Sequence, residues 1–316
     1  MRILHSRRFQ EVAGSIVVLA VFVLPAFVWA GGTKKVYVDA RVTGSQNGSV
    51  NHPYKTISEA LRHVNDNDEV HVAAGTYKEN IEIPENVDVY GIDEDKTTIV
   101  AASSSKPAVI MSHKSMINKF TVKGGEHGIY VGRNSKATIV HCIVKDSDKD
   151  GIHARETKKM SGKYELVIAK SEVRDNDRAG VFSEKRKVVI VDSIIHGNDN
   201  DGADIAAGSQ AWIDDNNFRD NGGSGLKISL DNSSVFVASR NTFRDNGHEG
   251  VEVNAYGKSG MVNIKKSKFI DNKKYGIARI ARTGNVSSNV WKGLTETDNA
   301  FSSNDKGNVS PVLNLR

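Results

Sequence analysis

A four-residue phrase recurs seven times in this chain: glycine, an aliphatic or small residue, any residue, then usually another small or apolar residue. Successive copies lie 23, 29, 22, 23, 25 and 26 residues apart, beginning at Gly128, Gly151, Gly180, Gly202, Gly225, Gly250 and Gly276. Self-similarity at this period predicts a stack of one supersecondary unit, in which each copy contacts only its neighbours. Such a repeat constrains the architecture strongly and the activity weakly.

Further columns of residues stay in register with these glycines. An asparagine stands four residues before each of the last five: Asn176, Asn198, Asn221, Asn246 and Asn272. An apolar column runs through Val144, Val173, Ile195, Phe218, Phe243 and Phe269. Within a repeat the apolar residues alternate with a period of two, which is typical of short strands. We therefore expect coils of strands, stacked about 4.8 Å apart, that bury their apolar faces only against one another.

The asparagine and glycine columns mark the turns of these coils. Asparagine tolerates left-handed backbone and can hydrogen-bond to its copy in the next coil. Glycine offers the same conformational freedom without a side chain. We expect both columns to supply the backbone conformations that the turns require.

These columns resemble those of the right-handed parallel β-helix proteins, the pectate-lyase-like superfamily, and the asparagine column resembles that family's asparagine ladder. The resemblance extends to the N-terminal part, in Val36-Tyr37-Val38-Asp39, Pro53 to Leu61 and Gly75 to Asn80. It implies a short strand, a capping helix and then the first coils. Thr56 and Glu59 have capping-box spacing, which suits the start of that helix.

The expected fold is therefore all-β: a single-domain right-handed parallel β-helix, or solenoid, with a short N-terminal capping helix. We expect the β-helix domain to span residues 31–290, with its N-terminal cap at about 31–66 and regular coils at about 106–280. Beyond Gly276 the period fades. Residues 291–316 are expected to form a C-terminal cap or a flexible tail.

The first 30 residues have the pattern of a secretory signal peptide. Arg2, Arg7 and Arg8 precede an apolar run from about Val12, and Val28-Trp29-Ala30 places small residues where a signal peptidase cleaves. We expect cleavage after Ala30 and no stable membrane insertion afterwards. The run is also just long enough to be retained as an anchor, and that alternative stays open. In either case the rest of the chain is expected to be secreted or periplasmic.

The net charge and the cysteine content limit the kinds of partner that we expect. The net charge is +5, and residues 1–30 carry three Arg and one Glu, so the remainder carries +3. This mild balance does not indicate a nucleic-acid partner. The single cysteine, Cys142, allows no internal disulfide, so we expect the stacked core to hold a monomer together unaided.

One column should face solvent on every coil. It consists of the residue two positions after each glycine: Tyr130, His153, Phe182, Asp204, Lys227, Glu252 and Ala278. A sugar unit in a β-linked chain repeats at about the coil spacing, so such a column would contact one sugar per coil. The alternative is that outward positions tolerate any residue.

The resemblance also implies a chemistry for part of this column. In β-helix lyases, carboxylates hold a Ca²⁺ that neutralises a uronate, and a Lys or Arg removes the neighbouring proton. It implies Lys227 as the base and Asp201, Asp204 and Glu252 as Ca²⁺ ligands, while His153 is a second catalytic candidate. Acids without a metal would raise the pKa of the lysine, so the scheme requires the ion. No catalytic motif of the superfamily is matched residue for residue, and a surface salt-bridge ladder is the alternative.

A basic edge adds a second set of candidates. The loops that follow the outward strands carry Arg155, Lys158, Lys159, Lys163 and Lys185, and the largest insertion, around residues 157–163, falls there. With Tyr130 and Phe182, these residues are the substrate-binding candidates, because longer loops of a solenoid usually map to its binding face. An anionic polymer is the natural partner of such an edge. A merely solvated lysine-rich edge is the alternative.

The sequence thus favours an extracytoplasmic, carbohydrate-associated β-helix protein that binds an acidic, uronate-type polysaccharide. Whether it also cleaves the polymer as a lyase, or epimerises it, stays open. The alternative from a different class is a non-catalytic β-helix that serves as a surface, adhesive or structural module.

Overall fold

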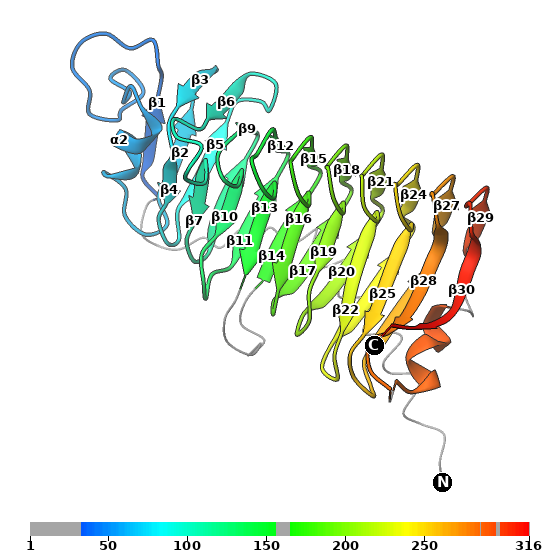
Figure 1. The fold of residues 1–316 in the computed structure, drawn as a ribbon. Coiled ribbons are helices and arrows are strands. Elements are labelled where there is room, and N and C mark those ends of the chain that lie inside the picture. The colour runs from blue at the N-terminus through cyan, green and yellow to red at the C-terminus, as the bar shows by residue number, and fades with distance from the viewer. Residues whose placement is uncertain (1–32, 156–164, 285, 295–297, 316) are drawn as a thin grey trace. The chain divides into compact units, whose positions relative to one another are not determined.

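The computed structural model describes residues 33–155, 165–284, 286–294 and 298–315. The chain divides into two compact units, 1–33 and 34–316, and the second contains all the described strands. The predicted signal peptide lies outside the described residues. In the second unit, three parallel sheets wind around one core as successive coils (Figure 1).

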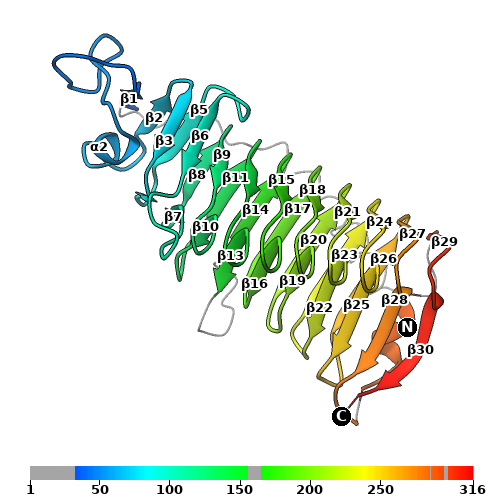
Figure 2. The ribbon, with the colours of Figure 1, turned by 45° about the horizontal axis from the view of Figure 1, so that its top comes forward.

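Each sheet contains ten strands, and each coil contributes one strand to every sheet over most of the unit (Figure 2). Sheet 1 contains β1 (Lys35–Val38), β2 (Glu69–Val72), β5 (Asp88–Gly91), β8 (Ser115–Asn118), β11 (Ala137–Val140), β14 (Glu165–Ala169), β17 (Lys187–Val191), β20 (Gln210–Asp214), β23 (Val235–Ser239) and β26 (Met261–Lys265). Sheet 2 contains β4 (Ile81–Ile83), β7 (Val109–Met111), β10 (Ile129–Val131), β13 (Ile152–Arg155), β16 (Val181–Glu184), β19 (Ala203–Ile205), β22 (Leu226–Leu230), β25 (Val251–Ala255), β28 (Tyr275–Ala281) and β30 (Gly307–Asn314). Sheet 3 contains β3 (Gly75–Lys78), β6 (Thr97–Val100), β9 (Thr121–Lys123), β12 (Ile143–Lys145), β15 (Glu172–Arg174), β18 (Ile194–His196), β21 (Asn217–Arg219), β24 (Thr242–Arg244), β27 (Lys268–Ile270) and β29 (Ala300–Ser302).

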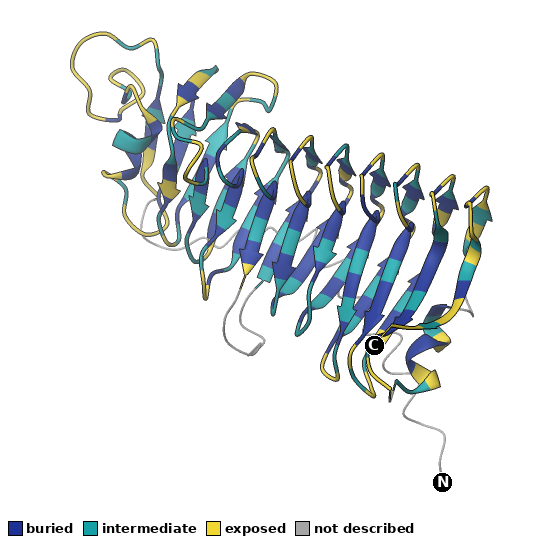
Figure 3. Ribbon diagram, in the orientation of Figure 1, coloured by how far each residue is buried: buried dark blue, intermediate teal, exposed yellow. Residues whose placement is uncertain are grey.

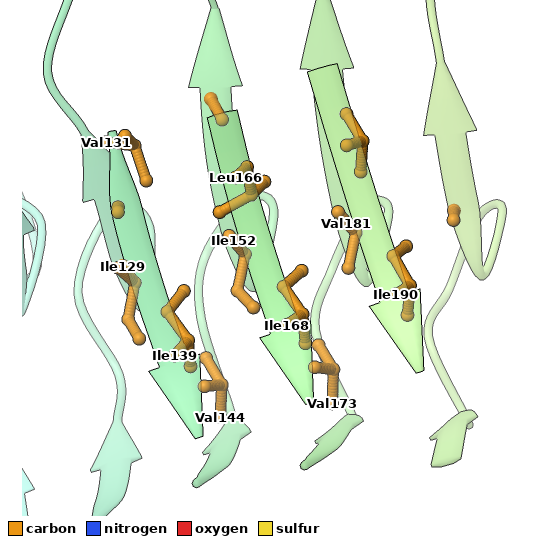
Figure 4. Packing of buried hydrophobic residues seen from close by; sticks show 14 of the residues in the cluster. Ile129, Val131, Ile139, Val144, Ile152, Leu166, Ile168, Val173, Val181 and Ile190 are labelled. Atoms are coloured by element: carbon orange, nitrogen blue, oxygen red, sulfur yellow. The ribbon is translucent and has the colours of Figure 1, made fainter. Parts of the chain in front are cut away.

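The core follows from the period-two alternation. Alternate residues of the strands are buried, whereas most exposed residues lie in the turns (Figure 3). Apolar side chains from all three sheets point into the same interior, including Ile129, Ile139 and Val144 (Figure 4). The register pairs similar residues of successive coils, as in Ile139, Ile168 and Ile190 of sheet 1. Burying each additional apolar side chain contributes about 1.5–3 kcal/mol, so stability accumulates coil by coil.

The asparagine ladder is present and extends one coil further than the repeat suggested. The Nδ2 atoms of Asn176, Asn198, Asn221, Asn246 and Asn272 donate to the Oδ1 of the next asparagine at 2.8–3.0 Å, and the last acceptor is Asn304. These side chains are buried, so every hydrogen bond that the ladder makes satisfies a group that water cannot reach.

The expected backbone roles of the two turn columns are wrong. The left-handed residue is the one before each ladder asparagine, as at Asp175 (φ 53°) and Asp220 (φ 54°), and the repeat glycines do not have positive φ. Those glycines are required by close packing instead. A Cβ at Gly151 would lie 2.7 Å from Nδ2 of Asn176 and 2.8 Å from the carbonyl oxygen of Gly180. The column stays glycine because the ladder of the next coil occupies the space of a side chain.

Both ends of the β-helix are covered. The short helix α2 (Ile57–Leu61) contacts β1, β2 and β4, and Thr56 caps it by accepting a hydrogen bond from the backbone N–H of Glu59 at 3.1 Å. At the other end, the 3₁₀ helix η1 (Ser288–Leu294) packs on β26 and buries Trp291. The segment for which the sequence predicted a cap or a flexible tail also supplies β29 and β30.

Candidate functional site

The predicted outward column lies along sheet 2. Cα pairing joins Tyr130 to His153, His153 to Phe182, Phe182 to Asp204, Asp204 to Lys227 and Lys227 to Glu252, one residue per coil. These six are partly exposed, whereas Ala278, the seventh residue of the predicted column, pairs with Glu252 but is buried, so its predicted exposure is wrong. Several residues that precede repeat glycines contact this column, as Asp150 contacts His153, Asp201 contacts Lys227 and Ser224 contacts Glu252. We call the two columns together the sheet 2 stripe, which contains Tyr130, His153, Phe182, Asp204, Lys227 and Glu252 with His127, Asp150, Asp201, Ser224 and Glu249.

At one end of the stripe the aromatic rings stack at the spacing of the coils. The His153 ring lies between Tyr130, at 5.6 Å between centroids, and Phe182, at 5.0 Å, with interplanar angles of 9° and 16°. His127 lies beside the stack, with its ring centroid 4.4 Å from that of His153. Residues on β10, β13 and β16 therefore hold the imidazole of His153 in one orientation.

Asp150 connects the two histidines. His153 Nδ1–H donates to Asp150 Oδ2 at 2.8 Å, and His127 Nδ1 lies 3.6 Å from the same oxygen. The other oxygen, Oδ1, accepts the backbone N–H of Ala179 at 3.3 Å. Asp150 and His127 are buried, at 3% and 7% exposure. Burial and the neighbouring His153 lower the pKa of His127, which favours its neutral imidazole.

Beyond Phe182 the stripe becomes charged. Lys227 Nζ lies 3.2 Å from Asp204 Oδ2 and 3.3 Å from Asp201 Oδ2, so one ammonium bridges two carboxylates. Burial alone would lower the pKa of Lys227, but Asp204 and Asp201 outweigh it and raise the pKa above its ordinary value. Burial raises the pKa of Asp204, which Lys227 counteracts. Lys227 is therefore protonated at neutral pH in this arrangement, and a role as a base would require an ion that neutralises the two acids.

Of the three predicted Ca²⁺ ligands, the structure brings Asp201 and Asp204 together on Lys227. Glu252 instead accepts a hydrogen bond from Asn254 Nδ2 at 2.6 Å and lies 3.9 Å from Arg282. Burial raises the pKa of Glu249, its neighbour in the stripe. An incoming Ca²⁺ would have to replace the Lys227 ammonium, and this assignment stays a prediction.

The basic edge is partly neutralised where the structure describes it. Arg155 Nε lies 2.6 Å from Glu184 Oε2, and Lys185 Nζ lies 3.6 Å from Oε1 of the same glutamate. Lys158, Lys159 and Lys163 lie outside the described residues. Arg186, in the same basic stretch, does not belong to this edge: it is fully buried and donates to the carbonyl oxygens of Ser135 and Gly132.

Two residues of the sheet 2 stripe that contact His153, His127 and Asp150, were not predicted as site residues. Each directly precedes a repeat glycine, a position at which only Asp201 was predicted as a site residue. The recurrence of polar residues there, at His127, Asp150, Asp201, Ser224 and Glu249, is the signal that would have identified a second functional column.

The chain belongs to the right-handed β-helix region family, whose model matches residues 127–290. Among solved structures, the A-module of the mannuronan C-5 epimerase AlgE6 of Azotobacter vinelandii is similar, with 13% identity, a TM-score of 0.50 and coverage of 82% of this chain and 93% of that one. The pectate lyase Pel9A is similar with 15% identity, a TM-score of 0.50 and coverage of 89% and 78%. The predicted fold class and its resemblance to pectate-lyase-like proteins are confirmed.

No curated protein matches the sequence. No helix within the described part of the chain is both long and apolar enough to cross a bilayer.

Proposed function

We propose that this protein acts outside the cytoplasm and binds an acidic polysaccharide along the sheet 2 stripe. One observation carries the proposal: a single outward column, with one residue per coil, places a stack of aromatic rings two coils from a protonated lysine, with Asp204 on the coil between Phe182 and Lys227. The polymer would lie along the column, with sugar rings against the edges of Tyr130 and Phe182 and a uronate carboxylate at Lys227.

The chemistry of the column supports this orientation. Tyr130 and Phe182 present partly exposed aromatic surface, and a tyrosine adds a hydroxyl that hydrogen-bonds at a wet interface. The Lys227 side chain is 31% exposed, so its ammonium can reach a bound carboxylate while it still bridges Asp201 and Asp204. The names of the two similar structures, a mannuronan epimerase and a pectate lyase, are compatible with the proposal, but likeness of fold does not carry it.

The acids of the stripe set a condition on binding. Asp201, Asp204, Glu249 and Glu252 would repel a polyanion unless cations compensate them. Lys227 compensates one charge, Lys274 lies 3.9 Å from Glu249, and Arg282 lies 3.9 Å from Glu252. A Ca²⁺ bound with the polymer would compensate the remaining acid and a carboxylate of the polymer. We therefore expect tighter binding to polyuronate when Ca²⁺ is present.

The test is binding to polymannuronate and polygalacturonate, with and without Ca²⁺, and to a neutral glucan. Tyr130→Ala and Phe182→Ala should each weaken polyuronate binding about tenfold, as residues at the centre of an interface do. A matched control exists on sheet 1, where His71 is stacked between Tyr37 and Tyr90 at 5.6 and 5.3 Å. Tyr37→Ala and Tyr90→Ala should leave binding unchanged. Equal losses from both pairs of variants, or no binding by the parent protein, would refute the proposal.

A second candidate function, proton removal from a bound uronate, is favoured by the hydrogen bond from His153 to Asp150. A carboxylate at Nδ1–H leaves Nε2 as the free base of the imidazole, the arrangement used for general-base catalysis. Lyase activity would appear as ultraviolet absorbance of an unsaturated product, and epimerase activity as a changed sugar composition of the polymer. Either activity should be lost in His153→Gln. Binding without any product would show that the protein is a non-catalytic polysaccharide-binding protein.

A further inference from the structure

His127 is the part of the sheet 2 stripe that the hydrogen bond between His153 and Asp150 does not explain. Its side chain is more than nine-tenths buried, and its Nδ1 has no hydrogen-bond partner. A buried polar atom without a partner costs about 1–3 kcal/mol, so such atoms are rare without a function. This nitrogen lies 3.6 Å from Asp150 Oδ2, too far for a hydrogen bond, and thus faces the carboxylate that His153 binds.

We propose that His127, Asp150 and His153 bind a divalent transition metal, with Zn²⁺ as the simplest candidate, each through one atom. Within the described residues they form the one group of three whose ligand atoms all lie within 4.8 Å of one another. Zinc binds His nitrogen and Asp oxygen at about 2.0–2.2 Å, so tetrahedral ligand atoms lie about 3.4 Å apart. The present separations of 2.8 Å and 3.6 Å from Asp150 Oδ2 lie on either side of that value.

The type of ligand selects the class of metal. Two imidazoles and one carboxylate suit Zn²⁺, Cu²⁺ or Ni²⁺, whereas Ca²⁺ and Mg²⁺ prefer oxygen ligands alone. Three protein ligands leave a fourth position open, as in zinc sites that bind water or a substrate. The His153 side chain is 18% exposed and the other two less than 10%, so the open position lies toward the solvent side of His153.

The surroundings already hold the ligands in place. The Ala179 N–H binds the Asp150 oxygen that faces away from the histidines, and Tyr130 and Phe182 clamp the His153 ring. Such supporting contacts orient metal ligands and typically change metal affinity 10–100-fold when removed. This site does not depend on the proposed polysaccharide. A metal would, however, use the Nδ1 that now donates to Asp150, so the metal-bound protein could not use the His153–Asp150 pair as a base.

The test is calorimetric titration of untagged, chelator-treated full-length protein with ZnCl₂, followed by the visible absorption of Co²⁺ bound at the same site. We expect one metal ion per chain, and His127→Ala and His153→Ala should each weaken binding by at least about tenfold. His71 is the matched control, because it is also stacked between two rings and lies 2.7 Å from a carboxylate, Glu69. His71→Ala should bind zinc as the parent protein does.

A thermal readout separates loss of the site from loss of the fold. Zinc should raise the Tm of the parent protein and of His71→Ala, because a ligand that binds only the native state stabilises it. Zinc should not change the Tm of His127→Gln or Asp150→Asn, two variants that preserve the shape of the side chain. If the parent protein binds no zinc at millimolar concentration, or if His127→Gln binds it equally well, the metal site is refuted whatever the outcome of the polysaccharide experiments.

Discussion

The ladder asparagines hydrogen-bond to a partner one coil away, and neighbouring residues of the turn have different roles. In the turn before the ladder, the aspartate adopts the left-handed conformation and the asparagine after it makes the buried hydrogen bonds. Asp220 has φ 54°, while Asn221 donates to Asn246 Oδ1 at 3.0 Å. Aspartate and asparagine both tolerate left-handed backbone, so the sequence alone could not assign the two roles.

Burial should also make the thiol of Cys142 unreactive. The thiol occupies the position that Ser171 and Ser193 hold in the next coils, and burial raises its pKa to about 12. Since the thiolate is the reactive form, we predict that a thiol reagent at pH 8 leaves the native protein unmodified. The reagent should modify one thiol per chain after unfolding in urea. Rapid modification of the native protein would show that the coil around Cys142 opens or that the residue is not packed.

Asp88 on β5 should make stability depend on pH. Burial raises its folded pKa from the ordinary 3.8 to about 6. Its contribution to stability is therefore fully present below pH 3.8 and is lost as the pH rises through 6. Asp88→Asn mimics the protonated form, so it should stabilise the protein by about 1 kcal/mol at pH 8 and by little at pH 4. Urea unfolding at the two pH values measures this, and an equal effect at both would contradict the assignment.

At the scale of the strand, stacking of identical residues decides which positions carry stability. Phe218, Phe243, Phe269 and Phe301 stack in sheet 3 with ring centroids 4.9–5.1 Å apart, and Phe218 is fully buried. Phe218 pairs with Ile195 of the preceding coil and with Phe243 of the following coil. Loss of one ring therefore affects two interfaces between coils.

We predict that Phe218→Ala lowers the free energy of unfolding by about 3–5 kcal/mol, as other large truncations in cores do. Arg219→Ala is the control on the same strand. Arg219 pairs with Asp220 at 2.7 Å in a partly exposed ion pair, so its loss should change stability by no more than about 0.5 kcal/mol. Denaturant unfolding compares the two, and similar values for both variants would place Phe218 outside the core.

The elements show why the sequence predicted the fold better than the site. The columns of Asn, Gly and Phe repeat because every coil packs on a neighbour of the same shape. This repetition can be recognised in a single sequence. The stripe does not repeat: His127, Asp150 and Asp201 occupy equivalent positions with different chemistry, and so do Phe182 and Lys227 in the other column. Only the three-dimensional register shows that Asp150 faces two histidines and that Lys227 bridges two aspartates.

At the scale of the molecule, a β-helix places residues that are one repeat apart in the sequence next to one another on the surface of a sheet. Parallel pairing in register places Tyr130, His153, Phe182, Asp204, Lys227 and Glu252 on consecutive coils of sheet 2. A polymer whose unit repeats at about the coil spacing can therefore contact several coils with one binding mode. The same geometry explains why the ring stack and the charged part of the stripe are separate: they belong to different coils.

The most direct test of this account is a crystal structure of the protein with a bound oligouronate. We predict sugar rings over Tyr130 and Phe182 and a carboxylate within hydrogen-bond distance of Lys227 Nζ, with the oligosaccharide running along sheet 2. An oligosaccharide bound to sheet 1 or sheet 3, or held only by the edge around Arg155 and Lys185, would contradict the central claim that the sheet 2 stripe is the binding site.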